Sequence, residues 1–432
     1  MIPVYILDDE TPKHRAMGAA SRWWLHHSLA SLDAALREKG SRLILRRGKC
    51  EEQLAQIAEE CGVGEVHCLR HYEPWWRNAE RAVAKCVRLI CHDGSYLAPP
   101  GSVTTGTGGL YKIYTPFWRA LKERMPPSPP ANRPREIAAP AKWPSSDTLT
   151  DWGLLPTKPD WAVGFGRLWT PGEDAAGERV ADFIDEAGDY DRRRNLPSED
   201  GSSRLSPHLH FGEVSPAYIW HRIAEGSGNA DVFLSEIAWR DYAQTVLLQF
   251  PDYGANNARS AFDSFPWRTG SEATADLKAW QQGRTGYPVV DAGMRQLWAT
   301  GWMHNRVRMI AASFLIKHLL IDWRKGERWF WDTLVDADYG NNSVNWQWVA
   351  GTGVDSNMFP RIMAPLTQSE KFDAADYIRE WVPELAALDD RSIHDPDEVG
   401  RRPAAYPPKI IGHREARARA LAAYDVMKAY DN

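Results

Sequence analysis

One short segment of the chain gathers hydroxyl groups and a cation directly before a proline. It reads Gly201-Ser-Ser-Arg-Leu-Ser-Pro207, and proline favours the first turn of a helix. Hydroxyls, free backbone amides and a helix N-terminus together suit a phosphate or pyrophosphate. A simple helix cap is the alternative, and for this segment taken alone we favour the cap. Other motifs must decide between the two interpretations.

Four further segments combine carboxylate, guanidinium, amide and aromatic side chains. They are Glu236-Ile-Ala-Trp-Arg-Asp241, Thr285-Gly-Tyr-Pro-Val-Val-Asp-Ala-Gly-Met-Arg295, Gly301-Trp-Met-His-Asn-Arg-Val-Arg-Met309, and the stretch that contains Asp336-Ala-Asp338 and Asn341-Asn-Ser-Val-Asn-Trp-Gln-Trp348. In this order they resemble the flavin domain of the photolyase and cryptochrome family. The resemblance extends from about Tyr190 to Leu385, and a weaker one covers the amino-terminal part. Together these motifs are specific, whereas each alone is a weak signal.

The resemblance implies FAD as the cofactor. Asn342 matches the position that faces flavin N5, and a helix-capping asparagine is the alternative. Arg308 paired with Asp336 could stabilise negative charge at the ring. The implied FAD-binding residues are Tyr190, Ser202, Ser203, Arg204, Leu205, Ser206, Arg308, Asp336, Ala337, Asp338 and Asn342.

The resemblance also implies a partner, UV-damaged DNA that contains pyrimidine dimers. Photolyases flip their lesion out of the duplex into a pocket, which requires aromatic faces and polar groups. The implied lesion-binding residues are Glu236, Trp239, Arg240, Asn305, Arg306, Met309 and Trp348. Core packing is the alternative role for both tryptophans. Photolyases for (6-4) products carry histidines where this chain has Asn305 and Met309, so we predict repair of cyclobutane dimers, most like a class I photolyase.

The chain contains 21 tryptophans, an unusual number. By resemblance, Trp346 and Trp323 are the inner and middle members of a chain that carries electrons to the flavin. Trp267 is the best match to the outer member, although its spacing from Trp280 is longer than the family pattern. The implied catalytic residues are Trp346, Trp323, Trp267, Asn342 and Glu236. Two alternatives stay open, a cryptochrome-type blue-light photoreceptor and a (6-4) photolyase.

The composition limits the classes of protein to which the chain can belong. The 432 residues are 43% hydrophobic and 25% charged, which is typical of a globular protein of two domains. Neither a membrane span nor a secretory signal is indicated, so we expect a cytoplasmic monomer associated with the bacterial nucleoid. Five cysteines without a metal-binding spacing predict free thiols and no metal site. The net charge is −5, but the stretch 281–330 is locally basic and is the expected DNA-binding part.

The elements predicted from periodicity form two domains. Residues 1–125 alternate β-rich runs at Val4–Leu7, Arg42–Leu45 and Val66–Leu69 with helical stretches, as in a doubly wound parallel α/β sheet. Residues 126–165 form a proline-rich linker, and residues 166–432 form an all-α FAD-binding domain. One helix is predicted to start at a Ser21 cap, to carry an apolar stripe of leucines and to end at Gly40. Long helical segments are also predicted over 231–248 and 289–320.

The amino-terminal half departs from the family pattern. The family usually opens with one more strand and an arginine-rich segment, so we expect the sheet of this chain to lack its first, central strand. Around His71–Trp76, tryptophans replace the residues typical of folate-binding relatives. A second, antenna chromophore is therefore predicted to be a deazaflavin or a flavin rather than a folate, with an empty site as the alternative.

Overall fold

The computed structural model describes residues 1–226, 230–356 and 359–431. The chain divides into two compact units, and neither unit is one continuous stretch of sequence. The first unit comprises Met1–Gly188, Ser203–Asp252 and Val335–Gly340. The second comprises Asp189–Ser202, Tyr253–Leu334 and Asn341–Asn432. Residues predicted to bind FAD therefore occur in both units.

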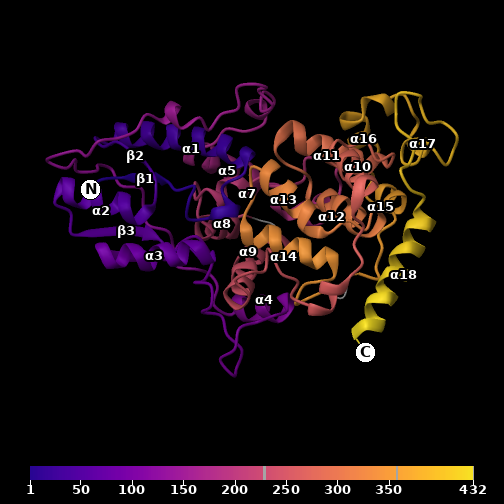
Figure 1. The fold of residues 1–432 in the computed structure, drawn as a ribbon. Coiled ribbons are helices and arrows are strands. Elements are labelled where there is room, and N and C mark those ends of the chain that lie inside the picture. Colours follow the sequence, from indigo (N-terminus) through magenta and orange to yellow (C-terminus); the bar gives the residue numbers. More distant parts are fainter. Residues whose placement is uncertain (227–229, 357–358, 432) are drawn as a thin grey trace. The chain divides into compact units, whose positions relative to one another are not determined.

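Strands and helices alternate at the start of the first unit (Figure 1). The elements are β1 (Val4–Leu7), α1 (Ala19–Glu38), β2 (Ile44–Arg47), α2 (Cys50–Cys61), β3 (Glu65–Leu69), α3 (Pro74–Cys86) and β4 (Arg88–His92). The parallel α/β prediction is confirmed, and β2 starts two residues later than the predicted run. Within the described residues, however, the strands form two small parallel sheets, β1 with β2 and β3 with β4, rather than one.

Helix α1 covers the β1–β2 sheet with the predicted leucine stripe. Leu25, Leu29 and Leu36 are buried in one cluster with Leu7 of β1 and Leu45 of β2. The predicted cap was wrong. The helix begins at Ala19 with Gly18 as N-cap, and Ser21 is buried inside its first turn. The predicted end at Gly40 is confirmed, because this glycine has a φ of +77° that other residues adopt at a cost.

The proline-rich stretch carries no helix or strand in the described chain between the end of α4 at Lys122 and a 3-10 turn at Leu149. Seven prolines between residues 126 and 144 explain this, because proline removes a backbone donor and restricts φ. Helix α4 (Tyr114–Lys122) precedes this stretch, and the other remaining helices of the unit follow it. They are α5 (Glu173–Ile184), α7 (Ser206–His210), α8 (Pro216–Ala224) and α9 (Asp231–Gln249).

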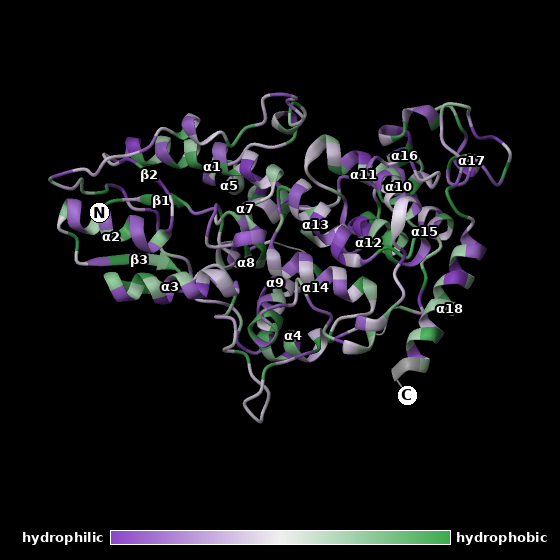
Figure 2. Cartoon of the chain, viewed as in Figure 1, coloured by the Kyte–Doolittle hydropathy of each residue, from purple (hydrophilic) through white to green (hydrophobic). Residues whose placement is uncertain are grey.

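The second unit is helical. The prediction of one continuous helix over 289–320 was wrong. Gly301, at φ +69°, ends the first helix there. Helix α18 buries Ala416, Ala420 and Met427, and hydrophilic residues alternate with hydrophobic ones along it (Figure 2). The helices are α6 (Tyr190–Arg193), α10 (Gly270–Gln281), α11 (Pro288–Thr300), α12 (Asn305–Ser313), α13 (Trp323–Thr333), α14 (Tyr339–Ala350), α15 (Pro365–Lys371), α16 (Ala375–Trp381), α17 (Asp390–Ile393) and α18 (His413–Asp431). The first two residues of α14 belong to the first unit. None of the described helices has the length and hydropathy needed to span a membrane.

A buried lysine makes the stability of this unit depend on pH. Lys317 lies in a π-helical turn after α12, and its ammonium group donates to the carbonyl oxygen of Arg361 at 2.9 Å. Burial lowers the pKa of Lys317 to about 7. The unfolded chain therefore binds more protons than the folded chain between about pH 7 and pH 10, so stability rises with pH there.

Replacing Lys317 with methionine should remove this dependence. We expect the free energy of unfolding of the wild type to rise relative to Lys317→Met by up to about 1.4 kcal/mol per pH unit in that window. Denaturant titrations of both proteins at several pH values measure the difference. A difference that stays constant with pH would show that Lys317 is charged in both states.

Candidate functional site

The Ser202–Ser206 segment lies at the division between the units, and Ser203 to Ser206 belong to the first. The Ser206 hydroxyl donates to the Asp336 carboxylate at 2.7 Å, which joins two of the predicted motifs. Arg204 has a φ of +51°, a conformation that costs free energy in residues other than glycine and is common at binding sites. The Ser203 carbonyl accepts from Arg179 at 3.0 Å, and Leu205 is buried. Hydrogen bonds of a backbone carbonyl and of a side-chain hydroxyl therefore hold the segment in place.

The Asp336-Ala337-Asp338 motif places two carboxylates near other titratable groups of the first unit. Burial raises the pKa of Glu73, and the charge of Asp338 raises it further. Burial lowers the pKa of His210, whereas the negative charges of Asp338 and Asp336 act to raise it. Ala337 is buried, whereas Ser206 beside Asp336 is exposed. The motif thus offers negative charge to a ligand that presents N–H donors.

Trp239 on α9 is fixed by neighbouring aromatic rings. Its indole stacks on the ring of Tyr114 with 3.8 Å between centroids and 10° between planes, and meets Tyr242 edge-on at 5.3 Å. The Tyr114 hydroxyl bonds the carbonyl oxygen of Ser235, one turn earlier on α9. Tyr114 therefore covers one face of the predicted lesion wall. Sequence reasoning missed Tyr114, because it lies 125 positions from Trp239 and in no matched motif.

The other two α9 residues differ in their contacts. Arg240 donates to the carbonyl oxygens of Ser95 and Leu209 at 3.2 and 3.0 Å, and its guanidinium lies over the ring of Tyr96. The Arg240 guanidinium is therefore bound to other residues of the first unit. Glu236 is half-buried on the same helix.

Helix α12 carries the predicted edge readers of the second unit. Asn305 is exposed, and Met309, four residues later, lies on the same face. The Arg306 guanidinium bonds the side-chain oxygen of Asn195 and lies 4.6 Å from the ring centre of Phe372. The imidazole of His304 accepts from the Arg306 amide and caps the helix. Because His304 is buried as a cap, it does not belong to the exposed face of α12.

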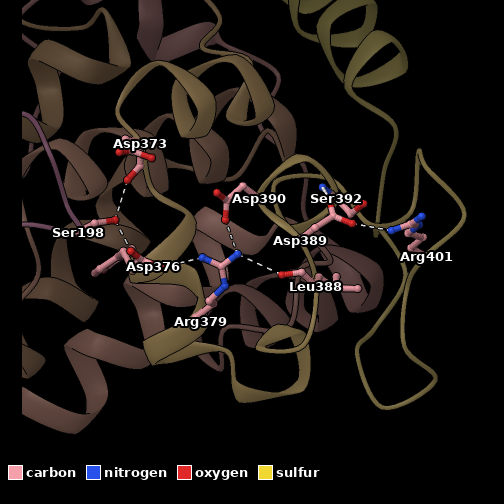
Figure 3. Close-up of polar contacts among 10 residues, drawn as sticks. Ser198, Asp373, Asp376, Arg379, Leu388, Asp389, Asp390, Ser392 and Arg401 are labelled. Atoms are coloured by element: carbon pink, nitrogen blue, oxygen red, sulfur yellow. Dashed lines mark hydrogen bonds and ion pairs between the residues drawn. The ribbon is translucent and has the colours of Figure 1, made fainter.

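The segment 189–202 is attached to α16 in the same unit. The Ser198 hydroxyl donates to the Asp373 carbonyl at 2.6 Å and accepts from the Tyr377 amide at 3.1 Å. Figure 3 shows these bonds and the guanidinium of Arg379 between Asp376 and Asp390. This attachment positions Asn195 against Arg306. Tyr190 begins α6 on the same segment, with the guanidinium of Arg194 over its ring.

Asn342 has its amide oriented by a buried glutamate. The Asn342 NH2 group donates to the Glu327 carbonyl oxygen at 3.0 Å and to the Glu327 carboxylate at 2.9 Å. Glu327 has no solvent exposure. With both N–H groups directed at Glu327, the amide oxygen of Asn342 is the atom directed elsewhere, and it can accept from a ring N–H. Sequence reasoning named Asn342 but missed Glu327, which lies in no matched motif.

Two more predicted residues of this unit have defined contacts. The Arg308 guanidinium donates to the Met303 carbonyl at 2.7 Å and lies over the ring of Trp302. Arg308 and Asp336 belong to different units, so their predicted pairing stays a prediction. Trp348 is half-buried near the end of α14, and its carbonyl accepts from Ser356 at 2.6 Å.

The three predicted electron-transfer tryptophans all belong to the second unit. Trp346 is buried and packs edge-on against Phe330 and Trp280, at 5.0 and 6.4 Å between centroids. Trp323 is buried and donates from its indole to Asn257 at 2.9 Å. Trp267 is half-buried and lies 4.3 Å from the ring centre of Phe265. Trp267 is therefore the least buried of the three, and their order in an electron-transfer chain stays a prediction.

Two family models match the chain. The FAD binding domain of DNA photolyase matches residues 233–426, and the DNA photolyase model matches residues 1–135. The chain is 46% identical to the deoxyribodipyrimidine photo-lyase of Agrobacterium fabrum over 99% of its own length and 92% of the relative. The chain belongs to the DNA photolyase and cryptochrome family. Cryptochrome-1 of Arabidopsis thaliana is 33% identical, with 97% of this chain and 65% of that protein covered.

Solved structures agree with this family membership. A bacterial class III photolyase from Agrobacterium tumefaciens matches with a TM-score of 0.93 at 45% identity, over 99% of this chain and 92% of that chain. An archaeal photolyase from Sulfolobus tokodaii, described with two FAD molecules, matches with a TM-score of 0.83 at 29% identity, over 98% and 93%. The predicted α/β and helical FAD-binding architecture is confirmed. The sequence motifs were interpreted as class I, whereas this solved relative is named class III.

The predicted site residues of this photolyase-family chain have the chemistry that FAD binding requires. In the first unit, the exposed Ser206 hydroxyl on Asp336 and the strained Arg204 backbone are features that a polar ligand would engage. In the second unit, the oriented amide oxygen of Asn342 is an acceptor for a ring N–H. Carboxylate and amide oxygens complement the N–H groups of a flavin ring. The donor set therefore agrees with FAD as the cofactor.

Trp346 depends on a glycine for its place in this photolyase fold. A Cβ atom on Gly326 would lie 2.2 Å from the Trp346 ring and 2.5 Å from Leu315. We expect Gly326→Ala to lower the free energy of unfolding by about 1–3 kcal/mol and to displace the Trp346 ring. Chemical denaturation and tryptophan fluorescence measure both effects. Gly177→Ala is the control, because nothing lies within 4 Å of its Cβ position. It should leave the fluorescence unchanged and, inside helix α5, raise the free energy of unfolding by up to about 1 kcal/mol.

Proposed function

We propose that this protein is a light-driven lyase that splits cyclobutane pyrimidine dimers in DNA. The observation that carries the proposal is the exposed face of α12. It presents the amide of Asn305. Met309 follows one turn later, partly exposed, with its sulfur accepting from the Arg306 guanidinium at 3.8 Å. The one imidazole of this segment, His304, is buried as the helix cap. A (6-4) photolyase is expected to present imidazoles there. The relatives named deoxyribodipyrimidine photo-lyase support the same reaction class.

FAD, when bound in its reduced form and excited by blue or near-ultraviolet light, supplies the electron that opens the dimer. Ser202, Ser203, Ser206, Asp336 and Asp338 would hold its polar parts. Asn342 presents its amide oxygen to a ring N–H, and Glu327 prevents the amide from turning over. Removing Glu327 would leave a buried amide donor without its acceptor, which costs about 1–3 kcal/mol.

The lesion is bound by aromatic faces and polar groups. Trp239 offers the ring face that Tyr114 leaves uncovered, and Trp348 is the second aromatic wall. Asn305, Arg306 and Glu236 provide hydrogen bonds to the flipped bases. Basic residues of the carboxyl half contact DNA phosphates, with Arg306 and residues 324–328 as the candidates, so affinity should fall as salt rises.

The other predictions from the sequence also belong to this proposal. The domain limits 1–125, 126–165 and 166–432, a monomeric state and a location in the cytoplasm at the nucleoid are parts of it. A second chromophore, a flavin or deazaflavin rather than a folate, is supported by the archaeal relative described with two FAD molecules. Its expected site lies around His71–Trp76, where the rings of His71 and Trp76 are 6.1 Å apart.

A cryptochrome-type photoreceptor is the second candidate, favoured by the identity to the Arabidopsis cryptochromes. One experiment separates the candidates. The purified, chemically reduced protein is illuminated with an oligonucleotide that carries one defined thymine dimer, and restored thymines are counted by chromatography. We expect restoration in light and none in darkness. Restoration of a (6-4) product instead would support the (6-4) alternative, and light-driven flavin reduction without any repair would support the photoreceptor.

A further inference from the structure

Two cysteines lie opposite each other on the β3–β4 sheet. Strands β3 and β4 are parallel, and their register places Cys68 directly beside Cys91. The Cys68 thiol donates to the Cys91 sulfur with 3.8 Å between the sulfur atoms. Neighbouring strands are about 4.8 Å apart, which is within the Cα separation of about 4.4–6.8 Å that a disulfide spans. The backbone is therefore already placed for a covalent bond between these residues.

Neighbouring side chains stabilise the register of the cysteine pair, and the pair is partly exposed to solvent. On the opposite face of the same strands, the imidazoles of His67 and His92 bond at 2.8 Å with their rings stacked. Both cysteines are partly exposed, so a small reagent has access to them. Burial and the neighbouring Cys91 raise the pKa of Cys68 to about 12, which keeps the proton on Cys68 and leaves Cys91 as the hydrogen-bond acceptor.

We infer that Cys68 and Cys91 form a dithiol that is reversibly oxidised to a disulfide by small disulfides such as oxidised glutathione. Cys91 loses its proton to the solvent, and its thiolate attacks one sulfur of oxidised glutathione, whose disulfide bond breaks and releases one glutathione thiolate. That thiolate takes the proton of Cys68. The Cys68 thiolate then attacks the Cys91 sulfur and releases the second glutathione as a thiolate, which takes a proton from the solvent. Both thiols are oxidised, and one oxidised glutathione is reduced to two glutathione molecules.

The bond would close a loop that carries part of the first unit's site. The loop contains α3, and Trp75 at the start of α3 packs edge-on against Tyr339, with 4.8 Å between centroids. Tyr339 directly follows the Asp336-Ala337-Asp338 motif. Oxidation would therefore restrain the segment that supports this motif, since cross-linking a loop removes conformational freedom from it. The inference itself does not depend on the proposed repair activity.

The test is a thiol map of the full-length protein. The protein is incubated with oxidised glutathione and unfolded in denaturant, free thiols are then alkylated, and peptides are analysed by mass spectrometry before and after treatment with dithiothreitol. We expect two of the five thiols to resist alkylation, one cross-linked peptide pair that contains Cys68 and Cys91, and full reversal by dithiothreitol. Amide hydrogen exchange in β3, α3 and β4 should be slower in the oxidised protein.

Matched variants separate the pair from the other cysteines. Cys86→Ser should leave the cross-link unchanged, although Cys86 is exposed and close in sequence to Cys91. Cys91→Ser should abolish the cross-link and leave Cys68 open to alkylation. The inference is overturned if Cys68 and Cys91 are both alkylated after oxidation of the wild-type protein, or if the cross-link joins Cys86 instead. Because the decisive measurement uses the wild type, poor folding of a variant does not affect it.

Discussion

Replacing Trp346 with phenylalanine should abolish light-driven reduction of the flavin while repair by chemically reduced protein continues. Trp346 is buried between Phe330 and Trp280, so phenylalanine retains most of the packing but loses the indole that is oxidised more readily. Electron supply to the flavin and electron transfer to the lesion are separate steps, and only the first is assigned to Trp346. Absorption spectra during illumination measure the first step, and dimer repair measures the second.

Trp280 provides the matched control for this experiment. It is also buried, it touches Trp346 edge-on, and its indole donates to the Ala311 carbonyl at 3.0 Å. Trp280→Phe should therefore have a similar cost in stability but should leave flavin reduction in place. If Trp346→Phe removes repair and photoreduction equally, Trp346 has a structural role, and the assignment of the electron-transfer chain is wrong.

Replacing Trp239 with alanine should weaken the binding of dimer-containing DNA. Stacking of a base on an aromatic side chain contributes about 1–3 kcal/mol, so the dissociation constant should rise by roughly 5-fold to 150-fold. Fluorescence anisotropy in darkness, with dimer-containing and undamaged oligonucleotides of the same sequence, measures this. The affinity for undamaged DNA should change little, because phosphate contacts provide it.

Two variants of Tyr114 separate its ring stacking on Trp239 from its hydrogen bond to helix α9 in the same assay. Tyr114→Phe keeps the ring on Trp239 but removes the hydroxyl that bonds Ser235, so it should bind the dimer almost as well as the wild type. Tyr114→Ala removes the supporting ring, and we expect a loss between those of Tyr114→Phe and Trp239→Ala. An equal loss for damaged and undamaged DNA in Trp239→Ala would contradict the role of Trp239 as a lesion wall.

Much of the architecture was predictable because local patterns encode it. The leucine spacing of α1 predicted the face that covers β1 and β2, and the prolines after residue 125 predicted a stretch without regular structure. Two local predictions failed. Ser21 lies inside α1 rather than at its cap, and Gly301 divides the predicted 289–320 helix, because a glycine at positive φ ends a helix whatever the apolar pattern on either side.

The family motifs identified Asn342 and Trp239 from the sequence, but their supporting residues came from packing. Glu327 orients Asn342 from another helix, and Tyr114 supports Trp239 from a segment far away in the chain. Such contacts depend on how helices pack, and no short-range periodicity reports them. The same holds for the cysteines. Their spacing predicted free thiols, and only the parallel register of β3 and β4 across helix α3 brings Cys68 and Cys91 to 3.8 Å.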